Sequence, residues 1–167
     1  MSEAYFQPAL EQRVIDILKP VIGEGTDATD YIKSWHHYLT DLNFDPRNYS
    51  SVFPFVVVST RSLDQIGAGE IGTRFEINAW TVNLYYIDVV KDYEEGRQRR
   101  ARLTHQIQKT LELEPRLQNL AVVAPNDDIA VKVYDSNFSS IQFDSSGQEG
   151  YYTFVSEMYL TVNTSKN

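Results

Sequence analysis

The 167-residue chain contains no cysteine. This absence excludes disulfide bonds, thiolate zinc sites and thiol nucleophiles. The sequence also lacks any apolar run of about 18 residues, the length that a membrane-spanning helix requires. Its first residues, Met-Ser-Glu-Ala, have neither the basic nor the apolar segment of a signal peptide. We therefore expect a protein of a cytosol-like compartment, or of an assembly built there.

Basic residues are scarce relative to acidic ones, since 15 Lys and Arg face 23 Asp and Glu for a net charge of -8. Residues 1–52 carry eight acids and four bases, and residues 127–167 carry six acids and two bases, so each segment contributes -4. Residues 53–126 carry nine of each and are neutral. Duplex-binding domains usually show a net basic face, so we do not expect this chain to grip nucleic acid. An acidic surface can still face DNA that must slide past without sticking.

The N-terminal third predicts one helix and one segment of open structure. Pro8 is typical of a first helical position, and Lys19 before Pro20 predicts the end of the helix. Its apolar stripe has helical period and consists of Leu10, Val14, Ile17, Leu18 and Val21. In residues 23–52 the aromatic and apolar positions fit either a short helix or an anchored loop; they are Tyr31, Trp35, Tyr38, Leu39 and Leu42.

The middle of the chain predicts strands and a second helix. Residues 53–59 read as a strand buried on both faces, because three valines are consecutive. In residues 73–90, apolar and polar residues alternate over an unusual length. The apolar residues change from odd to even positions near Ala79, which predicts a bulge or a change of packing partner. Asp92 with Glu95 three residues later predicts the start of a helix that ends at about Leu113. Gly96 in its first turn indicates close contact with a neighbouring element.

The last third predicts further strands. Residues 129–134 form one strand, Ile141 and Phe143 belong to a short second one, and residues 145–150 turn the chain. Tyr152, Phe154, Met158, Leu160 and Val162 alternate in a final strand. The predicted class is α+β: a mostly antiparallel sheet with a long hairpin arm, flanked by two main helices, in the order α-β-β-α-β-β within one domain over residues 1–167.

No catalytic, cofactor or metal site is predicted. Residues 67–72 match G-x-G-x-x-G, but a strand pattern follows where a dinucleotide site requires a helix, so a hairpin loop is favoured. His36 and His37 together with Asp41, with or without His105, show no zinc spacing. The serines do not form a nucleophile elbow.

The sharpest charge feature is an arginine cluster on the second helix, formed by Arg97, Arg99, Arg100 and Arg102. Two interpretations stay open. The cluster is a solvated helix face with Glu94–Arg97 and Glu95–Arg99 pairs, or it is a basic patch that meets an acidic patch on a neighbouring copy or partner. A second interface hypothesis concerns the loop 62–72, which we expect to become ordered on contact with a partner. Its named positions are Gly67, Gly69, Glu70 and Gly72.

The order of these elements resembles the tail terminator proteins of long-tailed bacteriophages, also called tail completion proteins, and their neck relatives. The residues that carry the resemblance are the buried strand Phe55-Val56-Val57-Val58, the long alternating run 75–89, the capped helix 93–113 and the final strand 151–163. The resemblance covers most of residues 8–22 and 53–163, and it is one of chain size and order of elements. Residues 23–52 are longer than in that family and form a possible added contact surface, for example for a tail sheath.

The resemblance implies a virion protein without catalysis or cofactor, assembled in the host cytoplasm. It would form a six-membered ring of identical copies at the head-proximal end of the tail. The ring would stop growth of the tail tube and present a face to the head connector, while DNA passes through its lumen without specific binding. Two alternatives stay open: another neck, head–tail joining or tube-like tail component, and a ligand-binding module or enzyme unrelated to phage.

Overall fold

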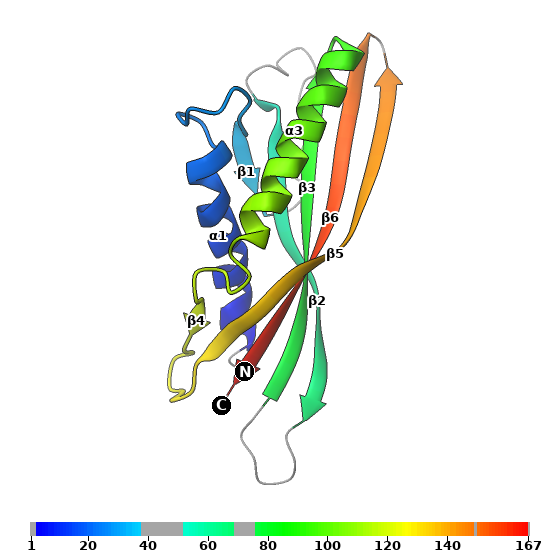
Figure 1. Cartoon of the computed structure of the whole chain (residues 1–167). Coiled ribbons are helices and arrows are strands. Elements are labelled where there is room, and N and C mark those ends of the chain that lie inside the picture. The colour runs from blue at the N-terminus through cyan, green and yellow to red at the C-terminus, as the bar shows by residue number, and fades with distance from the viewer. Residues whose placement is uncertain (1–2, 38–51, 69–75, 149, 167) are drawn as a thin grey trace.

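A computed structural model describes residues 3–37, 52–68, 76–148 and 150–166. Figure 1 shows a long twisted sheet with two helices on one of its faces. The elements are α1 Glu3–Ile22, β1 Ser34–His36, β2 Phe55–Ala68, β3 Glu76–Val90, α3 Tyr93–Glu112, β4 Ala121–Val122, β5 Val131–Gln148 and β6 Tyr151–Lys166. The α+β class is confirmed.

The six strands are arranged in the order β1-β2-β3-β6-β5-β4. All neighbours are antiparallel except β1 and β2, so the sheet is mixed and mostly antiparallel. The predicted element order omitted β1 and β4, because strands of three and two residues are too short to show a periodic pattern. A separate hairpin arm is not confirmed, since β3 pairs with β6 over its whole described length.

Helix α1 extends beyond both predicted ends and contains Pro8 and Pro20. Its first turns are held by Phe6, which is fully buried and lies 5.1 Å from the ring of Trp80. Its last turn is held by Ile22, which is buried, whereas Val21 is exposed. Packing against the sheet therefore overrides the local proline signals.

Helix α3 confirms its prediction. The Asp92 carboxylate accepts a hydrogen bond from the backbone N–H of Glu95 at 2.8 Å. The stripe of Leu103, Ile107 and Leu111 is buried. A Cβ atom at Gly96 would lie 2.4 Å from side-chain atoms of Val90 and Phe154, so the predicted close contact exists.

Strand β2 is buried on both faces at its start, as predicted. Val56 and Val58 join the main core, whereas Phe55 and Val57 belong to a smaller cluster on the other face. The strand continues to Ala68, so the loop predicted from Ser62 is wrong up to that residue; its remainder lies outside the described residues.

Of the bulge or change of packing partner predicted near Ala79, the bulge is wrong in its placement. Strand β3 keeps an uninterrupted register with β6. Instead, β2 is irregular at Arg61 and Ile66, opposite this part of β3. The apolar positions of β3 with even numbers, such as Trp80 and Val82, point into the main core.

Strand β5 joins the two strands that were predicted separately, and it takes up residues of the predicted turn as far as Gln148. Its register with β6 shifts at Tyr134 and at Ser139. At each shift, odd-numbered and even-numbered residues exchange faces of the sheet, and this is why the alternation in the sequence looks interrupted. Strand β6 alternates along its length as predicted.

Of the two alternatives for the segment that includes Tyr31 and Trp35, a short helix or an anchored loop, the helix is wrong where the structure describes it, because Ser34–His36 is the strand β1. Residues 38–51 of the possible insertion lie outside the described residues. No described helix is long and apolar enough to cross a membrane.

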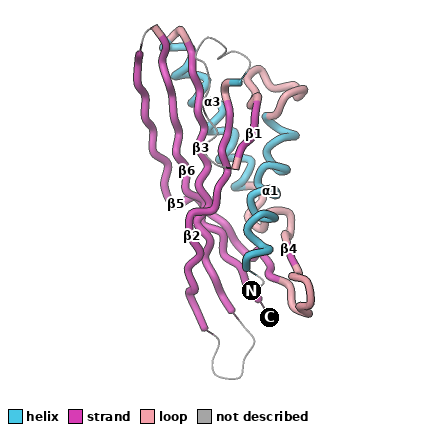
Figure 2. The backbone as a smooth tube through the Cα atoms, turned by 180° about the vertical axis from the view of Figure 1, so that it is seen from behind, coloured by secondary structure: helices cyan, strands magenta, loops and turns pink. Residues whose placement is uncertain are grey.

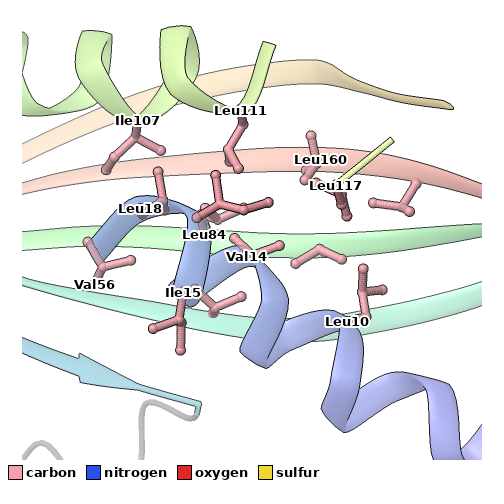
Figure 3. Packing of buried hydrophobic residues seen from close by; sticks show 14 of the residues in the cluster. Leu10, Val14, Ile15, Leu18, Val56, Leu84, Ile107, Leu111, Leu117 and Leu160 are labelled. Atoms are coloured by element: carbon pink, nitrogen blue, oxygen red, sulfur yellow. The ribbon is translucent and has the colours of Figure 1, made fainter. Parts of the chain in front are cut away.

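The main core lies between the two helices and one face of the sheet. Figure 3 shows side chains of both helices meeting those of the strands, among them Leu10, Val14, Leu18, Val56, Leu84, Ile107, Leu111 and Leu160. Figure 2 shows the opposite face of the sheet, which no described helix crosses. We call this the open face.

Candidate functional site

The four arginines of α3 were predicted as a solvated face or a basic patch, and each has a partner within the chain. Arg97 forms an exposed ion pair with Glu94 at 2.7 Å, as the first interpretation predicts. Arg102 donates to Asp30 at 2.6 Å and so ties α3 to the segment after α1. The predicted Glu95–Arg99 contact is present only at 4.0 Å.

Arg99 is directed into the fold. Its Nε and Nη2 atoms donate to the two carboxylate oxygens of Asp88, at 2.7 and 2.6 Å. Asp88 is fully buried and also accepts a hydrogen bond from the hydroxyl of Tyr86 at 3.0 Å. Burial, followed by the charge of Asp88, raises the pKa of Tyr86 well above its usual value. Burial opposes the charge of Arg99, but the hydrogen bonds to Asp88 outweigh it and raise the guanidinium pKa.

Arg100 braces the join between α3 and the outer strands. Its Nη1 donates to the backbone carbonyl of Asp144 at 2.7 Å, and the guanidinium lies 5.2 Å from the ring centre of Phe143 and 5.1 Å from that of Phe154. Beside it lies a groove of about 380 Å³, which we call the α3/β5 groove. No carboxylate lines it; the lining residues are Arg97, Arg100, Ala101, Thr104, His105, Gln108, Ile141 and Phe143.

The sheet has two long edges that no other described strand covers. On one side, β1 pairs with β2 only as far as Val57. On the other side, β4 pairs with β5 only at Val131 and Lys132. An uncovered edge offers its backbone N–H and C=O groups to another chain.

One point on the β2 edge is protected by α1. The carboxylate of Glu11 accepts from the backbone N–H and the hydroxyl of Thr60, at 3.3 and 3.4 Å. Burial raises the pKa of Glu11, while the bonds from Thr60 and the charge of His37 oppose that shift. The contact fixes α1 against the strand at the place where the edge becomes open.

A polar cluster on the open face was not predicted. The carboxylate of Glu157 accepts from the hydroxyls of Tyr85, at 2.8 Å, and of Tyr159. Asn83 donates to the Tyr85 hydroxyl at 3.2 Å, and Arg61 lies 5.6 Å from the ring centre of Tyr159. The signal in the sequence is the spacing of two within each strand, which places polar and aromatic side chains on one face.

This cluster holds its phenols in the protonated form. Burial and the bond to Glu157 raise the pKa of Tyr85, and the bond to Glu157 and burial raise that of Tyr159. Protonated phenols that donate to a carboxylate are neither bases nor nucleophiles at neutral pH. The hydrogen bond between Tyr85 and Glu157 therefore links β3 to β6.

The remaining predicted positions do not come together. Gly67 lies near the end of β2, and Gly69, Glu70 and Gly72 lie outside the described residues. His36 is in β1 with its Nε2 3.2 Å from the Ser34 hydroxyl, whereas His105 lines the α3/β5 groove. In the part of the chain that the structure describes, no three His, Asp or Glu side chains are grouped to hold a metal ion.

No protein-family model and no curated protein matches this sequence.

Proposed function

We propose that this chain is a structural protein of a virion, similar to phage tail terminators. Identical copies form a ring that caps the tail tube, stops its elongation and offers a docking face to the head connector. The observation that carries the proposal is one sheet with two different uncovered edges at its opposite sides. A closed ring needs a heterologous interface, in which two different surfaces of one molecule meet. Two different edges supply such a pair.

The open face of the sheet supports the second part of the proposal, a lumen that DNA traverses. On the halves of β3 and β6 that hold Thr81 and Ser165, this face carries half-exposed hydroxyl and amide side chains, namely Thr81, Thr161, Asn163 and Ser165. The other half carries the smaller apolar cluster around Phe55 and Val89. Hydroxyl and amide groups lack the positive charge that binds phosphates. The net charge of -8 adds a general repulsion of DNA.

The β2–β3 hairpin is the element that we assign to the tail tube. Figure 1 shows that the ends of these strands near Ala68 and Glu76 extend past α1. We propose that this end is the long arm of the hairpin and contacts the tube, together with the connection that includes Gly69, Glu70 and Gly72. The exposed Arg97, at the opposite end of the sheet, belongs to a face available to the connector or a tail sheath.

A tube-like tail subunit or another neck component is the alternative that the same uncovered edges favour. Tube subunits form rings that stack on one another, whereas a terminator forms one ring and ends the stack. The two functions therefore differ in the phenotype of their loss.

Electron microscopy of lysates from a phage whose copy of this gene is disrupted separates these functions. Overlong tubes beside tailless full heads are expected for a terminator. Tails of normal length that remain unattached would assign the protein to head–tail joining, and absence of tubes would assign it to the tube itself. Normal infectious particles would refute all three.

A further inference from the structure

Two exposed apolar side chains lie on the uncovered edges of the sheet. Leu63 on β2 is 38% exposed, and Phe143 on β5 is 60% exposed. Leu63 pairs with Trp80, and Phe143 pairs with Ser156, and both of these partners are buried beneath the helices. Because directly paired residues share a face, Leu63 and Phe143 both lie on the helix-covered side.

The β5 edge is regular and has an apolar groove beside it, so it can pair with a further strand. From Ser140 to Gln148 its register with β6 is uninterrupted, so this part of the edge is free of bulges. Arg100 holds it by its bond to the Asp144 carbonyl and by stacking on Phe143. The α3/β5 groove lies directly beside this edge and is lined by Ile141 and Phe143, so it offers apolar surface to an incoming side chain.

The β2 edge has a matching segment. Between its irregular positions at Arg61 and Ile66, residues 62–65 form a regular stretch that pairs with β3. Leu63 is the apolar side chain of this stretch on the helix-covered side. Bulges on both sides confine regular pairing to a short segment, which restricts promiscuous association.

We propose that β2 of one copy adds to β5 of the next and places Leu63 in the α3/β5 groove beside Phe143. This inference rests on the ring proposed above and identifies its interface. Strands β2, β3, β6 and β5 alternate in direction, so β2 and β5 of one copy are antiparallel. Rotation about a ring axis that lies broadly along the strands leaves the strand directions of the next copy unchanged. The pair formed by β5 of one copy and β2 of the next is therefore antiparallel as well.

The required offset between copies is compatible with a closed barrel. Leu63 lies in the row of Trp80, whereas Phe143 lies in the row of Tyr86, which is 86 − 80 = 6 residues further along β3. Six residues correspond to about 20 Å along a strand. Four strands are about 19 Å wide, and a strand tilt of about 45° staggers adjacent copies by a similar distance. For Leu63 to reach Phe143, the strands must tilt in the sense that displaces β2 of the next copy along β5 toward Gln148.

Crosslinking tests this interface cleanly because the chain has no cysteine. Leu63→Cys and Phe143→Cys proteins are prepared separately, mixed at several concentrations and treated with a short bis-maleimide. The expected result is a heterodimer, at least about tenfold more abundant than in a control mixture of Val21→Cys with Phe143→Cys. Val21 matches Leu63 in exposure, at 42%, but lies on α1. Equal yields in the two mixtures, or no crosslink at any concentration, overturn the proposal.

Two further measurements separate this interface from the proposed function. A Leu63→Cys homodimer that exceeds the heterodimer overturns the proposal, because it indicates a two-fold contact. Phe143→Asp should lower the thermal midpoint of the monomer only slightly, because Arg100 keeps its bond to the Asp144 carbonyl and its contact with Phe154, and it should lose rings in electron micrographs. Rings that persist in Phe143→Asp overturn the interface but leave the ring function standing. A specific crosslink together with normal particles from the gene-disrupted phage supports the interface and refutes the function.

Discussion

Among single residues, Arg99 is the clearest case of a charged side chain that stabilises the fold of its own chain. Its removal in Arg99→Ala would leave the fully buried Asp88 without its cation. Breaking a buried ion pair in this way lowers the free energy of unfolding by about 3–5 kcal/mol. Urea denaturation of the purified variant measures this loss.

Two companion variants show whether the buried charge is the cause. Arg97→Ala removes the exposed partner of Glu94 and should leave the urea midpoint almost unchanged. The double variant Asp88→Asn, Arg99→Gln leaves no buried charge and should recover much of the stability. Equal losses for Arg97→Ala and Arg99→Ala would contradict this account. The result also matters for assembly, because charge reversal at Arg99 would destabilise the monomer and so would not test an interface alone.

Glu11 supplies a prediction on pH. Burial raises its pKa above the usual 4.5, so the folded chain binds this proton more tightly than the unfolded chain. The stabilisation is fully present below 4.5 and is lost as pH rises through the raised folded value. Glu11→Gln should therefore raise the thermal midpoint at neutral pH, and the gain should shrink in acid.

Glu24→Gln is the matched control, because Glu24 is exposed and lies just beyond the same helix. It removes the same charge without a buried environment. A midpoint gain of equal size in both variants would assign the effect to net charge and not to burial of Glu11.

At the scale of secondary-structure elements, Gly96 sets the distance between α3 and the sheet. An added methyl group would meet Val90 and Phe154 at 2.4 Å. Overpacking of this kind costs about 1–3 kcal/mol, whereas Ala in place of Gly gains about 1 kcal/mol of helix propensity. Gly96→Ala should therefore be neutral to destabilising in urea, and Phe154→Leu in the same chain should restore part of any loss. A clear stabilisation would mean that the helix can shift away from the sheet.

The same scale shows which elements can be predicted from sequence. Helix α3 was predicted in full because its cap at Asp92, its apolar stripe and its end are all local signals. Strand β5 was divided in two because the bulges at Tyr134 and Ser139 break its alternation. The proline signals in α1 failed because Phe6 and Ile22 gain burial against the core.

The candidate site was less predictable than the fold because its partners are distant in the chain. The arginine cluster was found, but its contacts with Asp88, Asp30 and the Asp144 carbonyl depend on tertiary structure. The uncovered edges follow from strand order, which no local pattern contains. Leu63 and Phe143 become notable only once that order places them on the same side of the sheet.

At the scale of the whole molecule, the net charge opposes association of identical copies, whereas the uncovered sheet edges favour it. Each copy carries a net charge of -8, so identical copies repel one another in dilute salt. The four arginines that could offset this repulsion all have partners within the chain. The proposed contact between β2 and β5 instead relies on backbone pairing and on apolar contact between Leu63 and Phe143.

This difference predicts how assembly depends on salt. Raising the ionic strength from about 0.01 M to about 1 M shortens the Debye length from about 30 Å to about 3 Å and screens the repulsion between copies. The oligomer fraction, measured by analytical ultracentrifugation, should therefore rise with salt. Arg97→Glu changes the net charge from -8 to -10 without altering either sheet edge. This variant should need more salt than the wild type and reach the same assembly at the highest concentration. Oligomers that dissociate as salt is added would show that complementary charges hold the copies together, and the strand-pairing interface would then be wrong.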